Sequence, residues 1–332
     1  MIGTLSSPAI LDAPQTAANR LDAVIWSLIA ATAVIVALSV PIGGFHPVWE
    51  SFVRPAGALL PLLAGRWFYA NIRRSPQIAT ALSGTAQIVA FAAVAAPLSY
   101  IATAMSAPFP LQDHTFDVVD KAFGFDWRAL LTWMDANSAV YAPLRTVYSS
   151  LTVQASIAIL VLAFARLFVW LRIFMLAFII AALIGLAASI AVPAHGAWSY
   201  AGLTLDDCPN ILPVVRDIPV PIIDGLRDGS YRLLMAIGSE GIITFPSLHA
   251  AFAVILIVAF WPVPVLRWIG LAFDVLMLVA TPVDGSHYLV DIFAGLAVAA
   301  VAVSSAWYLA MQFMISGNSD AALQPAARPA AR

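Results

Sequence analysis

Charged residues are scarce in this chain of 332 residues, since Asp, Glu, Lys and Arg together make up 10% of it. Soluble domains carry about 25%, whereas 62% of the residues here are hydrophobic and the mean hydropathy is +0.91. This scarcity excludes an ordinary soluble enzyme. The formal net charge is -2, so no basic excess is present for binding nucleic acid or another polyanion.

Cysteine is almost absent, because Cys208 is the only one. A single cysteine excludes an intramolecular disulfide and any Cys-x-x-Cys metal motif. The first twenty residues also lack the basic start and apolar core of a cleaved signal peptide. We therefore expect the first hydrophobic segment to stay in the mature protein.

Long hydrophobic runs are what the sequence has in abundance. A run of about 18 residues crosses a hydrocarbon core of about 30 Å. The second candidate span is doubtful because it contains two arginines and two prolines. We expect an all-α, polytopic membrane bundle of six to eight transmembrane helices, drawn from candidate spans at 24–42, 52–70, 78–105, 145–165, 171–192, 247–265, 268–284 and 288–314.

Two polar segments interrupt these spans. Apolar residues recur at helical spacing within 106–144, with charges between them, which predicts an interfacial amphipathic helix. The segment 193–246 is rich in Pro, Gly and Asp and predicts a structured loop. The chain is therefore divided into a tail at 1–23, N-terminal transmembrane helices at 24–105, the interfacial segment at 106–144, a helical core at 145–315 that contains this loop, and a tail at 316–332.

The charges on the short loops predict an orientation. If all eight spans cross, both termini and three short loops share one side, which carries nine arginines and three aspartates. The positive-inside bias places that side in the cytoplasm. We expect a plasma (inner) membrane protein with both termini cytoplasmic and both long segments on the extracytoplasmic side.

Two histidines open spans near the C-terminus, on the expected outer side. His287 and Asp291 are four residues apart, so on a helix they share a face, and the carboxylate can orient the imidazole. The other ring nitrogen is then free to attack an electrophile. Ser247 follows Pro246 and predicts an N-cap at a helix start that suits phosphate oxygens. His249, just inside that helix, is placed to protonate a leaving oxygen.

The order Pro-Ser-x-His followed by His-x-x-x-Asp resembles the type 2 phosphatidic acid phosphatase (PAP2) superfamily. Within it, Phe-Pro-Ser-Leu-His-Ala from Phe245 and Gly-x-His-Tyr-x-x-Asp-x-x-Ala-Gly from Gly285 are more similar to the branch of inositol-phosphorylceramide and sphingomyelin synthases. The resemblance covers 240–296, and more weakly 113–245.

This resemblance implies a role for each site residue. His287 would be the nucleophile that forms a phosphohistidine, Asp291 its orienting partner, and His249 the acid for the departing alcohol. No metal or other cofactor is implied, and the partners are membrane lipids. The implied activity is phospholipid headgroup transfer, with a lipid phosphate phosphatase, of the phosphatidate or isoprenyl-phosphate type, as the alternative.

The sequence departs from the phosphatase branch where that branch binds phosphate. Leu248 replaces its Gly, Ala280-Thr281 replace Ser-Arg before the second histidine, and Ala129 replaces the Pro after Arg128. Loop ion pairs with Asp224 or Asp228, a solvated helix face, or snorkelling would equally explain the cations. The candidate phosphate-binding residues are Ser247, Arg227, Arg232, Lys121, Arg128 and Arg145.

Two other classes of function stay open. His249, His287 and Asp291 are chemically adequate zinc ligands for a membrane hydrolase, although no His-Glu-x-x-His pair is present. Asp274 lies within a candidate span, where it should face the bundle interior, and could indicate a transporter. The chain shows no internal repeat of the kind common in transporters. Its oligomeric state is open.

Overall fold

The computed structural model describes residues 8–216, 219–236 and 242–323. This part of the chain is almost entirely helical, and its only sheet pairs two strands of two residues each. The expected all-α polytopic bundle is confirmed. The α-helices are α1 (Pro8–Gly43), α2 (Trp49–Asn71), α3 (Pro76–Met105), α4 (Asp113–Ala122), α5 (Trp127–Ala136), α6 (Ser138–Tyr148), α7 (Leu151–Phe164), α8 (Phe168–Ala191), α9 (Ala197–Tyr200), α10 (Val220–Asp228), α11 (Leu248–Phe260), α12 (Leu266–Asp284) and α13 (Leu289–Leu323).

Five described helices are long and apolar enough to cross a membrane, namely α1 from Thr16 onward, α3, α8, α12 and α13 to Ser316. A sixth span results if α6 and α7, which meet at a bend of 47°, are counted as one broken crossing. The remaining predicted spans correspond to α2, which carries the arginines noted above, and to α11, which is apolar but only 13 residues long. The chain is an integral membrane protein.

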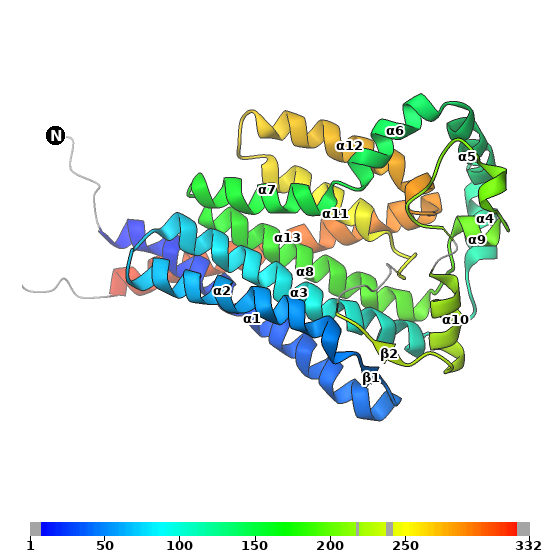
Figure 1. Cartoon of the computed structure of the whole chain (residues 1–332). Coiled ribbons are helices and arrows are strands. Elements are labelled where there is room, and N and C mark those ends of the chain that lie inside the picture. The colour runs from blue at the N-terminus through cyan, green and yellow to red at the C-terminus, as the bar shows by residue number, and fades with distance from the viewer. Residues whose placement is uncertain (1–7, 217–218, 237–241, 324–332) are drawn as a thin grey trace, which may run out of the picture.

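Helix α8 occupies the middle of the bundle. Its sequence is apolar on all sides, as expected of a helix that is covered all round. It packs against α3 and α13, between which it runs in Figure 1. The main hydrophobic cluster joins residues of α1, α3, α7, α8, α11 and α13. Asp274 of α12 is fully buried, so it faces the bundle interior as the sequence predicts.

One end of the bundle is covered by short elements, which we call the cap (Figure 1). The cap comprises α4, α5 and the start of α6, together with α9, α10 and their loops. The predicted single interfacial helix over 106–144 is in fact several short helices. Gly124, at φ +78°, ends the first, and the Asp126 carboxylate accepts a hydrogen bond of 3.0 Å from Ala129 N to start the second.

The connection between α1 and α2 is tied to the cap. Strand β1 (His46–Pro47) pairs in parallel with β2 (Leu233–Leu234) in the segment after α10. At the opposite end, α1 begins at Pro8 and α13 continues to Leu323, so parts of both predicted tails, 1–23 and 316–332, are helical. The starts of α1 and ends of α13 lie at the end of the bundle away from the cap (Figure 1).

Candidate active site

The two histidine motifs come together where α11 and α13 begin. Ser247 is the N-cap of α11, since its Oγ accepts a hydrogen bond of 3.3 Å from Ala250 N. Its own backbone N–H donates to the carbonyl of Asp291, 3.0 Å away. Gly295 allows this close approach, because a Cβ there would overlap the Ser247 carbonyl. The backbone therefore joins the two helix starts directly.

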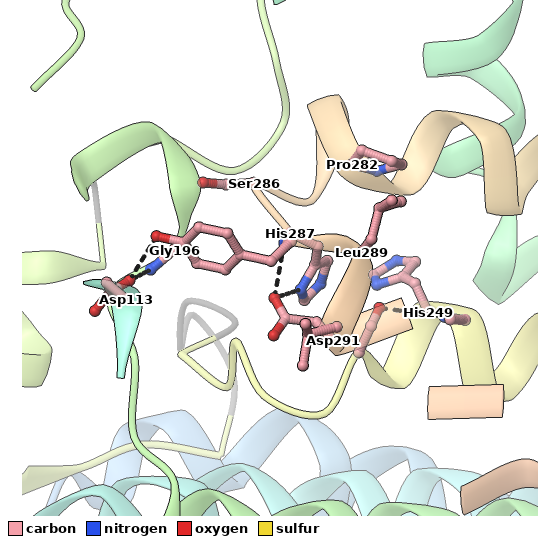
Figure 2. A network of polar contacts seen from close by, with 12 residues as sticks. Asp113, Gly196, His249, Pro282, Ser286, His287, Leu289 and Asp291 are labelled. Atoms are coloured by element: carbon pink, nitrogen blue, oxygen red, sulfur yellow. Dashed lines mark hydrogen bonds and ion pairs between the residues drawn. The ribbon is translucent and has the colours of Figure 1, made fainter. Parts of the chain in front are cut away.

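His287 and Asp291 form a buried pair. Asp291 Oδ2 lies 3.1 Å from His287 Nδ1 and also accepts a hydrogen bond of 2.9 Å from the N–H of Tyr288 (Figure 2). His287 is 4% exposed and Asp291 is fully buried. Burial lowers the pKa of His287 to about 4, against a weaker opposing effect of a backbone hydrogen bond with Thr244. The imidazole is therefore neutral at physiological pH.

His249 approaches His287 from α11, as Figure 2 shows. Its Nδ1 lies 3.2 Å from the hydroxyl of Tyr148, and the two rings are stacked with centroids 4.1 Å apart. Gly285 lies against His287 and Tyr148, because a Cβ at this position would overlap the His287 ring and lie 2.8 Å from the Tyr148 hydroxyl. The geometry thus gathers two imidazoles, one carboxylate and one phenol into a single buried site.

Acidic residues of α4 hold the start of α13 from outside. Asp120 accepts hydrogen bonds from Leu289 N at 2.8 Å and from Val290 N at 3.3 Å, so it caps α13 from a different helix. Burial raises the pKa of Asp120, although these two backbone bonds oppose the effect. Asp113 accepts from Gly196 N at 2.9 Å and from the Tyr288 hydroxyl at 3.1 Å (Figure 2). Sequence reasoning missed both roles; the only signal was acidic residues at helical spacing in 113–122.

Two of the candidate phosphate-binding arginines are occupied by backbone carbonyls. Arg227 donates to the carbonyl of Ser106 at 2.9 Å and to that of Phe109 at 2.8 Å. Arg232 donates to the carbonyl of Leu226 at 2.7 Å and lies over the ring of Phe45. These bonds fasten α10 to neighbouring segments, in place of the loop ion pairs that the sequence suggested.

The other three candidate cations line two cavities in the cap. Lys121 is paired with Asp117 at 2.7 Å, and Arg128 bonds the carbonyl of Ala201. Both line a cavity of about 250 Å³, which Tyr288 also borders. Arg145 lines a separate cavity of about 630 Å³. The histidines line neither cavity. The structure brings Ser247, His249, His287 and Asp291 together, and no hydrogen bond or ion pair within the described residues joins the five cations to them.

A second polar pair near the site was also missed. The hydroxyl of Tyr141 donates to Asp284 Oδ1 at 2.7 Å, and Asp284 is fully buried with its other oxygen unpartnered among the described residues. Asp284 also interacts electrostatically with Arg145 and with Tyr148. Arg145 is therefore linked through Asp284 to the phenol that stacks on His249.

The described residues contain no group of three or more His, Cys, Asp or Glu side chains arranged to hold a metal ion.

A family model described as the PAP2 superfamily matches residues 114–305, more than half of the chain and a range that includes both histidines. The chain belongs to the PAP2 superfamily. A search of curated proteins and one of solved structures each found no match. Membership indicates that this PAP2 protein is a phosphatase or phosphotransferase acting on lipid phosphates, and it does not distinguish the branches within the superfamily.

Proposed function

We propose that this PAP2 protein transfers a phosphate-containing headgroup between membrane lipids through a phosphohistidine on His287. The observation that carries this proposal is the buried His287–Asp291 pair, in which the carboxylate holds Nδ1 and the ring is neutral. A neutral imidazole keeps the lone pair on Nε2 that a nucleophile needs. His249, held by Tyr148 on the facing helix, supplies the proton-transfer group.

The proposed reaction has two steps. In the first, His287 Nε2 attacks phosphorus, the bond from phosphorus to the leaving lipid oxygen breaks, and protonated His249 gives its proton to that oxygen. The negative charge of the bound phosphate favours this protonated form of His249. In the second, His249 takes the proton of the acceptor alcohol as its oxygen attacks phosphorus, and the phosphorus–nitrogen bond breaks.

Two observations favour a lipid alcohol over water as the acceptor. His287 and Asp291 are nearly inaccessible, so bulk water has little access to a covalent intermediate. Thr281, which stands near the position where the phosphatase branch has Arg, is buried and bonds the carbonyl of Met277 within its own helix, so it does not supply the missing cation. Hydrolysis of a lipid phosphate is the alternative.

Product analysis separates these two reactions. The purified protein is incubated with phospholipids labelled at phosphorus, with and without ceramide or diacylglycerol. Transfer predicts a new labelled lipid that forms only when the alcohol is present. Label released into water at the same rate with and without the alcohol would select the phosphatase. Label that stays entirely in the starting lipids under all conditions would overturn both.

Inhibitors test the covalent step. A phosphohistidine enzyme should retain its activity in EDTA and lose it in vanadate, because vanadate adopts the trigonal-bipyramidal geometry of the transferring phosphorus. Complete loss of activity in EDTA, restored by zinc, would instead support a zinc hydrolase that uses His249, His287 and Asp291 as ligands.

A further inference from the structure

A third cavity lies at the end of the bundle opposite the cap. It has a volume of about 350 Å³ and is formed by α1, α2, α3 and α8 near the α2–α3 turn. Figure 1 shows these helix ends on the side of the N-terminus, away from α4 and α9. The residues that line it include Asn19, Arg66, Tyr69, Arg74, Phe168 and Arg172.

Arg172 is the deepest cation in this cavity. It is 8% exposed, and its Nη2 lies 3.5 Å from Asp22 Oδ1. Its Nε and Nη1 are buried and have no hydrogen-bond partner among the described residues. Buried donors are nearly always hydrogen-bonded in native proteins, and leaving a charged donor unpaired is costly. Arg172 therefore lines the cavity with part of its hydrogen-bonding capacity unused within the described residues.

The nearby carboxylate cannot balance the charge. Asp22 accepts a hydrogen bond of 2.8 Å from Gln87, and its other oxygen lies 3.2 Å from Arg66. One carboxylate is thus shared by Arg66 and Arg172. Arg74 adds a third cation from the turn between α2 and α3, and it has no ion pair with any described residue. The described lining contains three arginines and no acidic residue, so the cavity has a surplus of positive charge.

We propose that this cavity binds a phosphate group, carried by an anionic phospholipid or free in solution. Guanidinium groups bind phosphate oxygens through charge-assisted hydrogen bonds, and Arg66, Arg74 and Arg172 all line this cavity. Phe168 and neighbouring small side chains provide an apolar wall beside the cations, which suits the glycerol part of a lipid. Basic pockets between transmembrane helices bind lipid headgroups in other proteins.

This site is separate from His249 and His287, so the inference does not depend on the proposed function. The test uses the full-length protein in a neutral detergent. Its unfolding temperature is measured against increasing dioleoylphosphatidylglycerol, dioleoylphosphatidylcholine or inorganic phosphate. A ligand that binds only the folded protein raises this temperature in a concentration-dependent way. We expect phosphatidylglycerol to do so, and phosphatidylcholine to have a much smaller effect at equal concentration.

Neighbouring arginines provide a matched pair of variants. Arg73 and Arg74 are adjacent and exposed, but only Arg74 lines the cavity. Arg74→Gln should weaken phosphatidylglycerol binding about fivefold, whereas Arg73→Gln should leave it unchanged. Arg172→Gln should weaken it further, provided that the variant folds. His287→Ala should bind as the wild type does, so loss of catalysis and loss of this site are distinguishable.

The outcomes decide both the site and its source of phosphate. Stabilisation by phosphatidylglycerol alone indicates a lipid site. Stabilisation by inorganic phosphate, with the same loss in Arg74→Gln, indicates a site for soluble anions. Equal weakening in Arg73→Gln and Arg74→Gln, or no stabilisation by either phosphatidylglycerol or phosphate, would overturn the proposal.

Discussion

His287 combines two conditions that rarely coincide at a membrane interface. Its ring is almost fully buried, which keeps it uncharged, and one ring nitrogen is held by a carboxylate. An exposed histidine would be partly protonated and randomly oriented. Burial therefore keeps this imidazole neutral and the carboxylate keeps it oriented, and both are needed for the nucleophile role that we propose.

Replacing either histidine should nearly abolish turnover. His287→Ala removes the attacking nitrogen and His249→Ala removes the proton donor, so each variant should lose several powers of ten in kcat. Turnover of a labelled phospholipid measures the loss, and the unfolding temperature shows that each variant is folded. If His287→Ala retained more than about a tenth of the wild-type rate, His287 could not be the nucleophile.

The lowered pKa of His287 also predicts how stability depends on pH. Between about 6.5, the pKa in the unfolded chain, and about 4, the unfolded state binds a proton at this residue and the folded state does not. The stabilisation of the folded state by neutral His287 is therefore complete above pH 6.5, and it is lost as the pH falls toward 4. From pH 7.5 to 5, the wild type should lose about 2 kcal/mol that His287→Gln does not lose.

Chemical denaturation of both proteins at each pH measures this difference. Parallel losses in the wild type and in His287→Gln would show that the ring is not held neutral in the folded protein.

For single residues, the sequence is most informative where the role of a side chain depends on its neighbours along the chain. The sequence predicts the N-cap role of Ser247 and the pairing of His287 with Asp291, although His287 lies two residues before α13 and not on the helix itself. It does not predict the partners of Arg227, because the carbonyls of Ser106 and Phe109 are distant in sequence. Sequence alone therefore cannot distinguish an arginine that binds phosphate from one that binds backbone carbonyls of distant segments.

Among the elements of the cap, α4 holds the start of α13 in place. It supplies Asp120 to the first free N–H groups of α13, where a helix start otherwise leaves donors unsatisfied. Sequence patterns indicated an amphipathic helix here but could not show which helix it caps, because that depends on tertiary packing. For the same reason the sequence could not predict the hydrogen bond between Tyr141 and Asp284, which joins α6 to α12.

Asp120→Asn tests this cap against a neighbour on the same helix. Loss of a charged acceptor from a helix start should lower the free energy of unfolding by about 1–2 kcal/mol and should reduce kcat, because the His287–Asp291 pair loses its external support. Asp117→Asn is the matched control, since Asp117 forms an ion pair with exposed Lys121, caps no described helix and should change both quantities less. Equal effects of the two substitutions would contradict the capping role.

For the whole molecule, the unevenness of charge predicts which end faces the cytoplasm. The connections α2–α3, α7–α8 and α11–α12 lie at the end away from the cap (Figure 1), and they carry the arginines of the short loops. From the positive-inside bias we expect this end to face the cytoplasm and the histidines to lie on the outer side. Their lipid substrates would then come from the outer leaflet.

Cysteine labelling in intact cells checks this orientation. Cys208 is buried, and Cys208→Ala provides a background without native thiols. In that background, Asp206→Cys, at an exposed position of the cap, should react with an impermeant maleimide in intact cells. Ser75→Cys, at the start of α3, should react only after lysis. The reverse pattern would place the active site at the inner leaflet.

The direct backbone contact between Ser247 and Asp291, which Gly295 permits, has a consequence for how such an enzyme can be altered. Because Ser247 caps α11 and Asp291 lies in the first turn of α13, this contact fixes how the two histidine motifs meet. Chemistry and substrate choice can therefore change independently. Exchanging cap segments between superfamily members should give new lipid preferences with turnover intact, provided that an acidic residue remains at the position of Asp120.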